Sequence, residues 1–309
     1  YQKKLTTRTI DYFRRKEEET LIFTCGLFGL NRQVYYRSTK RSKASRKKAE
    51  QVIELVENIR IKMPKLGGRK LYFLLSEPLK ELKIGRDKFF NILRANHLLI
   101  IPKRSYHVTT NSHHRFRKHK NLVSDYQVTK PNQVWVADIT YIGNRKNPSY
   151  LSLITDAYSK KIVGHHVAEN LTTEGSLLAL NKAIKNQEPV LKSIIHHSDR
   201  GLQYCSDEYQ RILEKNNIKC SMTQNSDPYE NAVAERINGI LKQEFDIDKF
   251  DVETKIKRKI VDESIKIYNE LRPHFSNHYL TPNQMHKQEK LKIKTYKNKN
   301  QSKNVFTLV

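Results

Sequence analysis

The order of secondary-structure elements after residue 132 constrains the fold of this chain more than any other feature. β-rich runs at 134–142, 150–159 and 161–169 follow one another with only short turns between them. Beyond them the pattern alternates, and we predict helices at 172–184, 206–217 and 230–245 and strands at 193–199 and 218–223. Three adjacent strands followed by alternating helices and strands indicate one mixed sheet with helices on its faces.

This order is that of the RNase H-like α/β fold, which we predict for residues 126–246. Upstream, apolar residues at helical spacing predict helices at 49–63, 69–79 and 86–98. The short connection 81–85 between the last two contains Gly85 and is typical of a helix-turn-helix. The predicted domains are a small helical unit at 1–40, an all-α helix-turn-helix DNA-binding domain at 41–100, a basic linker at 101–125, the RNase H-like core at 126–246 and a helical basic C-terminal region at 247–309.

The third helix of the upstream region separates into two faces. Phe89, Ile92 and Leu93 can pack inward, which leaves a polar face of the residue types that reach phosphates and purine edges. A helical domain without a role in DNA binding is the alternative. The candidates for DNA contact on this face are Arg86, Lys88, Asn91 and Arg94.

The charge of the chain points to a polyanionic partner. Fifty-eight Lys and Arg against 32 Asp and Glu leave a net charge of +26, which favours nucleic acid. A membrane-surface protein is the main competitor, but the sequence has no run of 18 apolar residues. Basic stretches at 37–48, 103–120 and 288–309 are interpreted as linkers, arms along phosphates or simply solvated runs.

Cysteine usage favours a reducing compartment. The three cysteines, Cys25, Cys205 and Cys220, are odd in number and have no CxxC spacing, which argues against a disulfide framework and a zinc finger. We therefore expect a cytoplasmic, nucleoid-associated protein. A start at Tyr1 is typical of a processed chain or of the downstream part of a longer product.

Three carboxylates stand out by their context. Asp138 lies inside the apolar strand VWVADITYI, where an ionised side chain is costly unless it is paired or binds a metal. Asp199 ends a strand and is followed by Arg200 and a glycine. Glu235 lies on the last helix, where Asn231, Asn238 and Lys242 fall within about 60° of it and an apolar stripe lies opposite.

Such a set of oxygen ligands suits two Mg²⁺ or Mn²⁺ ions that act on a phosphodiester. The spacing of 60 and 35 residues between the acids is weak evidence by itself, because the chain has 32 acidic residues. The context of first strand, later strand end and long helix is the specific part of the signal.

Motifs along nearly the whole chain resemble DDE transposases of bacterial insertion sequences. WVADITYI, HHSDRGLQYCS, SMTQNSDPYENAVAERINGILKQEF and YNELRPH are similar to the core motifs, with a spacing shared with retroviral integrases. KLGGRKLYFLL and IGRDKFFNILRANHLLI resemble the helix-turn-helix segment of the group whose transposase is made by frameshifting, as its second-frame (OrfB-type) product. Glu230, Ser226-Asp227 and Arg236 depart from the commonest pattern, which suggests a subgroup.

The resemblance implies that Asp138, Asp199 and Glu235 are the catalytic metal ligands and that Lys242 contacts DNA. Asn231 and Asn238 are further candidates for DNA contact, and His197 and Arg200 would support the site. The implied reaction is metal-dependent cleavage and strand transfer at the ends of a mobile element. The implied partners are double-stranded DNA (the terminal inverted repeats and the target), further copies of the chain and an upstream-frame (OrfA-type) segment.

Alternatives for the function stay open at this point. They are an inactive or domesticated DNA-binding relative, an RNase H-like nuclease acting on RNA–DNA hybrids, and a structural chromatin-type protein.

Several other residues are assigned structural roles. We expect Asp156 to serve a turn, His196 to pack while His197 orients the site, Trp135 to lie in the core and Glu244 to be a surface acid. The resemblance suggests that four residues of a later helix end buttress the catalytic helix or touch DNA: Tyr268, Asn269, Arg272 and His274.

Overall fold

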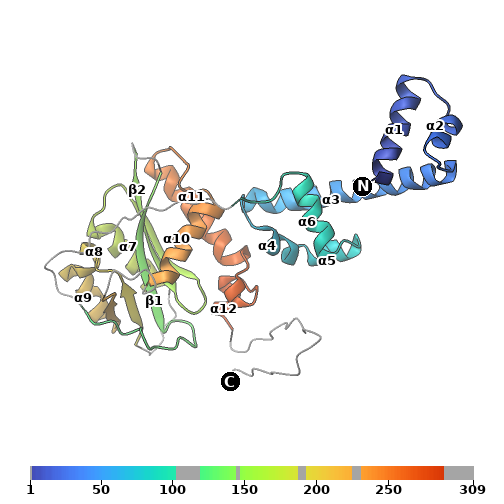
Figure 1. The fold of residues 1–309 in the computed structure, drawn as a ribbon. Coiled ribbons are helices and arrows are strands. Elements are labelled where there is room, and N and C mark those ends of the chain that lie inside the picture. Colours follow the sequence, from blue (N-terminus) through green and yellow to red (C-terminus); the bar gives the residue numbers. More distant parts are fainter. Residues whose placement is uncertain (1, 102–118, 144–146, 187–192, 225–230, 289–309) are drawn as a thin grey trace, which may run out of the picture. The chain divides into compact units, whose positions relative to one another are not determined.

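The computed structural model describes residues 2–101, 119–143, 147–186, 193–224 and 231–288. The chain forms two compact units (Figure 1), of which the first comprises residues 1–61 with 67–99 and the second residues 62–66 with 100–309. Most of the basic stretch at 103–120 and of the tail at 288–309 lies outside the described residues. No helix in the part of the chain that is described is long and apolar enough to span a membrane.

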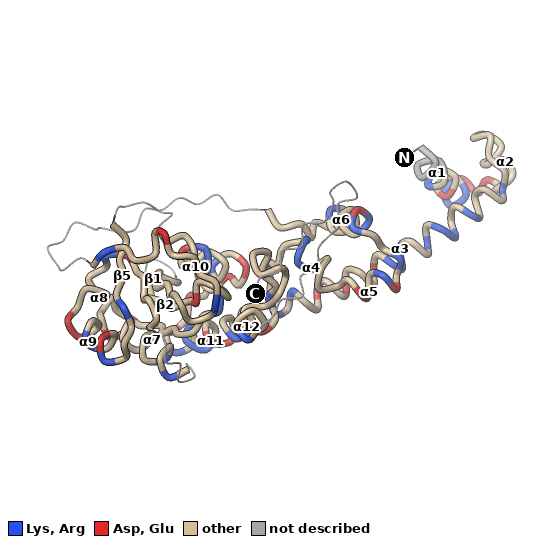
Figure 2. Tube along the Cα trace, turned by 90° about the horizontal axis from the view of Figure 1, so that it is seen from below, with Lys and Arg blue, Asp and Glu red and all other residues tan. Residues whose placement is uncertain are grey.

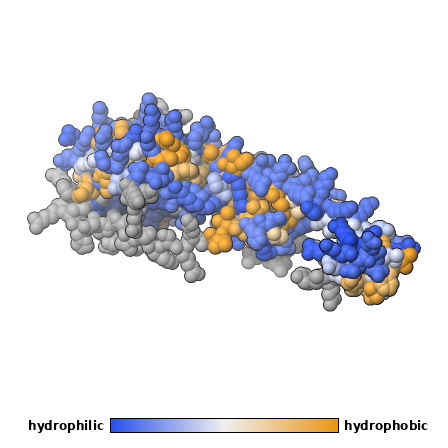
Figure 3. Space-filling view, turned by 90° about the horizontal axis from the view of Figure 1, so that it is seen from above, coloured by the Kyte–Doolittle hydropathy of each residue, from blue (hydrophilic) through white to orange (hydrophobic). Residues whose placement is uncertain are grey.

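The first unit is entirely helical. At its N-terminal end Ile10, Cys25 and Tyr35 form a small core, and the neighbouring Ile22, Phe23 and Leu27 are exposed, which gives this end an apolar area (Figure 3). Its helices are α1 (Gln2–Lys16), α2 (Leu21–Leu27), α3 (Arg32–Lys62), α4 (Gly68–Leu74), α5 (Ser76–Glu81) and α6 (Arg86–Ala95).

Two expectations for this unit need correction. The basic stretch at 37–48 is not a linker between structural elements, because α3 runs through it without a break. Lys, Arg and Ala are good helix formers, so this stretch can be helical although its sequence shows no hydrophobic period. The helix expected at 69–79 is two helices, since the chain leaves helical geometry at Leu75, ahead of Pro78. The domain limit at 40 falls inside α3, and the predicted limits remain predictions.

The second unit contains the five-stranded sheet, in the order β3-β2-β1-β4-β5. β1, β2 and β3 are antiparallel neighbours, and β4 and β5 run parallel to β1. The predicted strands and helices of the core are therefore confirmed in type and order. The strands are β1 (Val134–Ile142), β2 (Ser149–Asp156), β3 (Ile162–Ala168), β4 (Ile195–Ser198) and β5 (Lys219–Met222). The helices are α7 (Thr173–Lys185), α8 (Leu202–Cys205), α9 (Asp207–Lys215), α10 (Ala232–Glu244), α11 (Thr254–Leu271) and α12 (Pro282–His286), with the 3-10 turn η2 (Phe275–Asn277).

Helices cover both faces of the sheet. One face packs against α7 and α9 and buries Trp135 completely, as expected. The other face carries α10 and α11 (Figure 1), and Ala234 of α10 packs there against Val134 and Val136 of β1. Gly164 allows β3 to approach α7 closely, because a Cβ at this position would lie 2.2 Å from the carbonyl oxygen of Ala179.

The end of α10 is held by residues far away in the sequence. The buried Arg272 guanidinium donates to both carboxylate oxygens of Glu244, at 2.9 and 2.7 Å. Glu244 is thus not the surface acid that we expected, because the chain after α11 brings a guanidinium against it. Lys65, at the other end of the sequence, donates its backbone N–H to the Glu244 carbonyl and its ammonium to Asp246. Arg272 therefore contacts the end of α10, which agrees with the first of the two roles that the sequence suggested for it.

Asp156 is a structural residue, in agreement with the expected turn role. Its buried carboxylate accepts the backbone N–H groups of Asn132 and Ser159, each at 2.7 Å, and the Ser159 hydroxyl at 2.6 Å. His286 of α12 lies 3.6 Å from it. Burial opposes ionisation of this group, but the His286 and Ser159 hydrogen bonds outweigh it and lower the pKa of Asp156.

We expect Asp156→Asn to destabilise the second unit by about 2 to 4 kcal/mol at pH 7, because it weakens hydrogen bonds to a buried charge. A lowered folded-state pKa contributes stability above the unfolded value and loses it as the pH falls through the folded value. The difference in melting temperature between variant and parent should therefore shrink below about pH 4. The exposed Asp251→Asn is the matched control and should melt like the parent. An unchanged melting temperature for Asp156→Asn at pH 7 would contradict this role.

Candidate active site

Asp138 lies at the middle of the central strand β1, on the face that α10 covers. Its Oδ1 accepts the backbone N–H of Ile139 at 2.9 Å, and its Oδ2 accepts the Asn238 side-chain amide of α10 at 2.7 Å. β4 pairs with β1 only as far as Ala137, so the edge of β1 opens at this residue. The carboxylate is consequently fixed in orientation where the sheet splits.

Asp199 follows directly on β4. The register that pairs Val136 with His197 and Ala137 with Ser198 carries Asp138 and Asp199 to the same end of adjacent parallel strands. The Gly201 backbone N–H donates to Asp199 Oδ1 at 3.0 Å, and a Cβ on Gly201 would lie 3.1 Å from that oxygen. The turn that follows β4 therefore holds the second carboxylate.

Glu235 lies in the first turn of α10, with its side chain exposed. The same helix buries Ala234, Ile237 and Leu241 against the sheet, so Glu235 points away from the packed stripe. Burial raises the pKa of Glu235 above its ordinary value.

The three acids act on one another electrostatically. Burial first, and then the charges of Asp199 and Glu235, raise the pKa of Asp138 to about 7, against the lowering effect of Asn238 and the Ile139 N–H. All three carboxylates therefore share one electrostatic environment at the split of the sheet. Among the described residues, however, no three His, Cys, Asp or Glu side chains lie close enough together to hold one ion. The donor type and the mutual repulsion fit a divalent cation, since a cation would offset that repulsion.

Asn231 and Asn238 do not have the exposure that the expected DNA contact requires. They are 7% and 5% exposed, and their amides donate to the Ala137 carbonyl and to Asp138 respectively. Both asparagines thus join α10 to β1, and this corrects the sequence-based assignment. Helical angle alone put them beside Glu235, but only the packing of α10 on β1 decides that this face is inside.

We expect Asn238→Ala to lower the catalytic rate about 10- to 100-fold with little change in DNA affinity, because the Asp138 carboxylate loses the donor that orients it. The readouts are single-turnover cleavage and anisotropy-based DNA binding. Asn216→Ala removes an exposed amide at the end of α9 and is the control. Equal losses of rate and affinity would argue against an orienting role.

Lys242 and Tyr141 form a pair beside Asp138 that sequence reasoning only half identified. The Lys242 ammonium lies 4.8 Å from the centre of the Tyr141 ring, which is 44% exposed. Burial lowers the pKa of Lys242, while the charges of Asp248 and Asp138 oppose the shift. Tyr141 was missed, because strand alternation predicts that a residue three positions after Asp138 lies on the opposite face of β1.

The residues around β4 divide as the alternation of strand side chains predicts. His196 packs against the rings of Tyr204 and Tyr209 and lies 2.9 Å from the Tyr209 hydroxyl. His197 lies on the face of Asp199 and contacts the Ser221 hydroxyl at 2.9 Å. Packing of His196 is confirmed, whereas a role of His197 in orienting the site stays a prediction.

Two further side chains belong to this region. Arg200 donates to the Thr223 carbonyl at 2.6 Å, which ties the turn after β4 to the end of β5. Tyr204 was not identified from the sequence. Its pKa is raised by burial and then by the charges of Tyr209, Asp199 and Asp138, so its buried phenol lies near the acids.

The predicted inward face of α6 is confirmed, whereas the helix-turn-helix DNA-binding domain stays a prediction. Phe89, Ile92 and Leu93 of α6 are buried. The four predicted DNA-contact residues are exposed on the opposite face, and their contact with DNA stays a prediction: Arg86, Lys88, Asn91 and Arg94.

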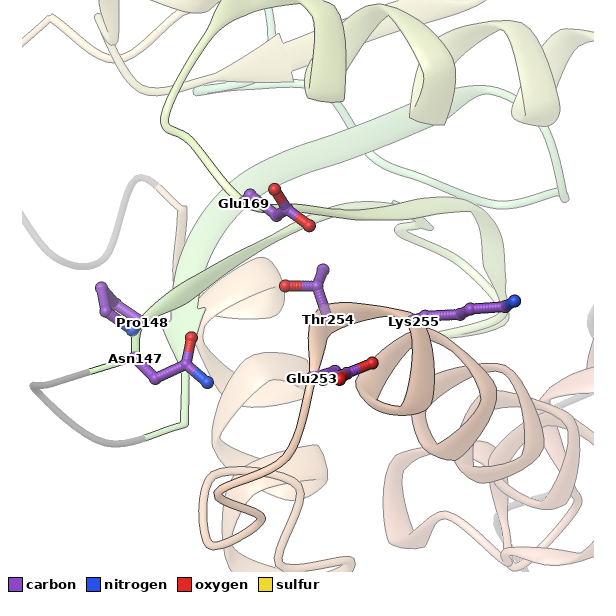
Figure 4. Close-up of a pocket in the computed structure, with 6 residues that line it drawn as sticks. All are labelled: Asn147, Pro148, Glu169, Glu253, Thr254 and Lys255. Atoms are coloured by element: carbon purple, nitrogen blue, oxygen red, sulfur yellow. The ribbon is translucent and has the colours of Figure 1, made fainter.

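A separate cavity of about 370 Å³ lies at the start of α11 (Figure 4). The residues that line it come from just before β2, from after β3 and from the start of α11: Asn147, Pro148, Glu169, Glu253, Thr254 and Lys255. None of the three candidate catalytic acids lines it, so we assign the cavity no role in their chemistry.

Comparison with known proteins identifies the family to which the chain belongs. Residues 128–228 and 216–282 match two family models described as "Integrase core domain". The chain is 36% identical over 224 residues to the insertion element IS600 uncharacterized 31 kDa protein of Shigella sonnei, covering 71% of this chain and 81% of that protein. The chain belongs to the insertion-sequence transposase family. Both the resemblance seen in the motifs and the integrase-type core of this transposase are thereby confirmed.

Other relatives of the transposase match over shorter parts. Transposase InsF for IS3A of Escherichia coli K12 is 32% identical over 53% of this chain and 57% of its own length. The putative transposase for IS986/IS6110 of Mycobacterium tuberculosis is 42% identical over 37% of this chain and 42% of its own length. The chain thus spans about half the length of these two relatives.

Among solved structures, the HTLV-2 integrase catalytic core domain in complex with magnesium covers 52% of the transposase and 99% of its own chain, at 21% identity and a TM-score of 0.42. A chain of a simian T-cell lymphotropic virus intasome covers 77% of the transposase and 81% of its own length, at 20% identity and a TM-score of 0.45.

Proposed function

We propose that this transposase cleaves DNA at the ends of an insertion sequence and joins those ends to target DNA. The observation that carries the proposal is the position of Asp138 and Asp199 at the same end of the adjacent parallel strands β1 and β4, against the helix α10 that carries Glu235. The membership of an integrase-core transposase family supports it. Within the family, the motifs favour a second-frame (OrfB-type) product.

The three acids would hold divalent cations, with Mg²⁺ or Mn²⁺ as the expected ions and two ions per site. When bound, such ions activate the attacking oxygen and stabilise the leaving oxygen of an in-line displacement at phosphorus. Burial, and then the charges of Asp199 and Glu235, raise the pKa of Asp138 to about 7, so a bound cation would offset the cost of its ionised form.

The residues around the acids would hold them ready for this chemistry. Asn238 and the Ile139 N–H fix both oxygens of Asp138, and the Gly201 N–H fixes one oxygen of Asp199. Lys242 supplies a cationic side chain beside Asp138 that suits a DNA phosphate. These hydrogen bonds thus orient the carboxylates of Asp138 and Asp199, while Glu235 remains exposed to solvent.

Double-stranded DNA is the proposed partner, both as the terminal inverted repeats and as the target. The exposed basic face of α6 and the net charge of +26 support this partner. Because two DNA ends must be joined in one event, we propose a homo-oligomer on DNA. An upstream-frame (OrfA-type) segment is a further proposed partner.

The test is cleavage and strand transfer on a labelled duplex that carries the element's own ends. The reaction is run with Mg²⁺, Mn²⁺ or EDTA, and the parent is compared with Asp199→Asn and with the exposed control Asp207→Asn. We expect metal-dependent joining that Asp199→Asn abolishes and Asp207→Asn retains. Duplex binding without any product, even after addition of the upstream-frame protein, would contradict the proposal and favour a DNA-binding relic.

A further inference from the structure

The middle of α3 is a bare basic helix within the first unit. All eight residues from Lys40 to Lys47 are exposed, and five of them are Lys or Arg. Before it, α3 is contacted by α1, where the Thr7 hydroxyl lies 3.2 Å from that of Ser38. After it, Lys48 donates to the Leu82 carbonyl and Val52 is buried. The helix therefore crosses an open stretch between two packed ends (Figure 1).

The charged side chains of this stretch are all positive, and most of them lie on one face of the helix. No acidic residue occurs from Arg32 to Ala49. At about 100° per residue, Lys40, Lys43, Arg46 and Lys47 fall within an arc of about 120°. Ser42 and Ser45 lie outside this arc. Figure 2 shows Lys and Arg following one another along this part of α3.

Most of these basic side chains have no ion pair within the described part of the chain. Arg46 pairs with Glu50 at 3.0 Å, and both side chains are largely exposed. Among the residues that the structure describes, no ion pair or side-chain hydrogen bond is recorded for Lys40, Arg41, Lys43 or Lys47. Neither packing nor salt bridges account for this cluster, so a partner outside the chain is indicated.

A partner of opposite charge would stabilise this helix. Lys40 and Lys43, Lys43 and Arg46, and Lys43 and Lys47 are like charges three or four residues apart, which destabilises a helix. Short helical stretches without tertiary packing are marginal in water. A polyanion that neutralises the arc would remove the repulsion and keep the helix continuous.

We propose that residues 40–47 of α3 are a DNA-binding helix that lies along the phosphates of duplex DNA and is stabilised there. The inference rests on the proposed function, since it takes DNA as the ligand. The contact is distinct from the polar face of α6, because it is made by a bare segment of a single long helix. Continuous basic helices are a known way for proteins to cross duplex DNA. With one phosphate per about 1.7 Å of duplex axis and a helix rise of about 1.5 Å per residue, several phosphates are within reach.

The test is duplex binding by the full-length chain, measured by fluorescence anisotropy of a labelled 30-base-pair DNA over a salt series. Lys40→Gln/Lys43→Gln/Lys47→Gln removes three charges, so the slope of log K against log salt should fall by about 2.7. Arg211→Gln/Lys215→Gln/Lys219→Gln, which removes three exposed charges on α9 and β5, is the matched control. The control should keep the parental slope.

A second variant separates a helix from an extended basic arm. Ala44→Pro keeps every charge but interrupts α3 at an exposed position, and it should lower duplex affinity at least tenfold. Ala44→Gly should have a smaller effect in the same direction. Circular dichroism of the free chain should show lower helicity in Ala44→Pro than in the parent, because the proline interrupts α3. Unchanged thermal melting of the full-length chain in each variant would show that both units remain folded.

Each outcome decides one point. Parental binding and slope in the triple Gln variant would overturn the contact, and parental binding in Ala44→Pro would overturn the helix. Equal competition by single-stranded DNA of the same length would overturn the assignment to a duplex. A parent that binds no duplex at low salt would instead remove the proposed function itself, and the inference with it.

Discussion

Asp138→Asn is expected to lower strand transfer at least about a thousandfold and at the same time to stabilise the second unit. Activity falls because the side chain loses the charge that would bind a cation. Stability rises because the pKa of Asp138, raised to about 7, means that folding disfavours its ionised form. The amide that replaces it has the same shape and can still accept the Ile139 N–H.

The sign of the pH dependence follows from this pKa. An acid whose folded-state pKa lies above its unfolded value destabilises the folded state as the pH rises from the unfolded to the folded value. The gain from Asp138→Asn should therefore be absent near pH 4 and reach about 1 to 3 kcal/mol near pH 8. Thermal melting in EDTA at both pH values measures it. The exposed Glu263→Gln is the control and should change neither activity nor melting.

A stable but inactive variant would separate this site from a structural ion pair. If Asp138→Asn instead lost stability at pH 8, the carboxylate would be a net stabilising group in the fold. That result would speak against three mutually repelling acids, whatever the activity.

Arg272→Met is expected to destabilise the second unit by about 3 to 5 kcal/mol, which corresponds to a fall in melting temperature of about 10 °C. The Arg272 side chain is 1% exposed, and its two hydrogen bonds to Glu244 hold the end of the helix that carries Glu235. Removal of the guanidinium leaves a carboxylate that is 14% exposed without its principal cation. Urea unfolding followed by circular dichroism measures the effect.

Two companion variants test the ion pair itself. Arg272→Lys should recover only part of the stability, because an ammonium cannot make the paired hydrogen bonds of a guanidinium. The double variant Glu244→Met/Arg272→Met should be more stable than Arg272→Met, since no buried charge is left over. Additive losses in the double variant would show that the two side chains contribute independently.

Local pattern was enough to predict the core. The apolar strand around Asp138, the strand that ends at Asp199 and the amphipathic helix with Glu235 each carry a periodicity that depends on residues close in sequence. The chain order of these elements then limits the possible sheets to very few. For the same reason the burial of Phe89 and Leu93 in α6 was predictable.

The contacts that could not be predicted from the sequence are those between residues far apart in the chain. Nothing near Glu244 shows that Arg272 will reach it, and nothing near Lys65 points to Asp246. These contacts exist only because the fold brings Arg272, at the end of α11, and Lys65, after α3, to the end of α10. A charged residue with a hidden partner looks like a surface residue in the sequence.

The sequence by itself determined the elements of this protein and the three acids that its motifs single out, because strand alternation and helical periodicity are local properties. Only the tertiary structure decided that Asn231 and Asn238 face inward, where they join α10 to β1. Helical angle assigns residues to a face but not to inside or outside, which depends on the surface that the helix covers. Likewise, only the structure revealed the bare stretch of α3, because the absence of packing, unlike charge, cannot be read from a sequence.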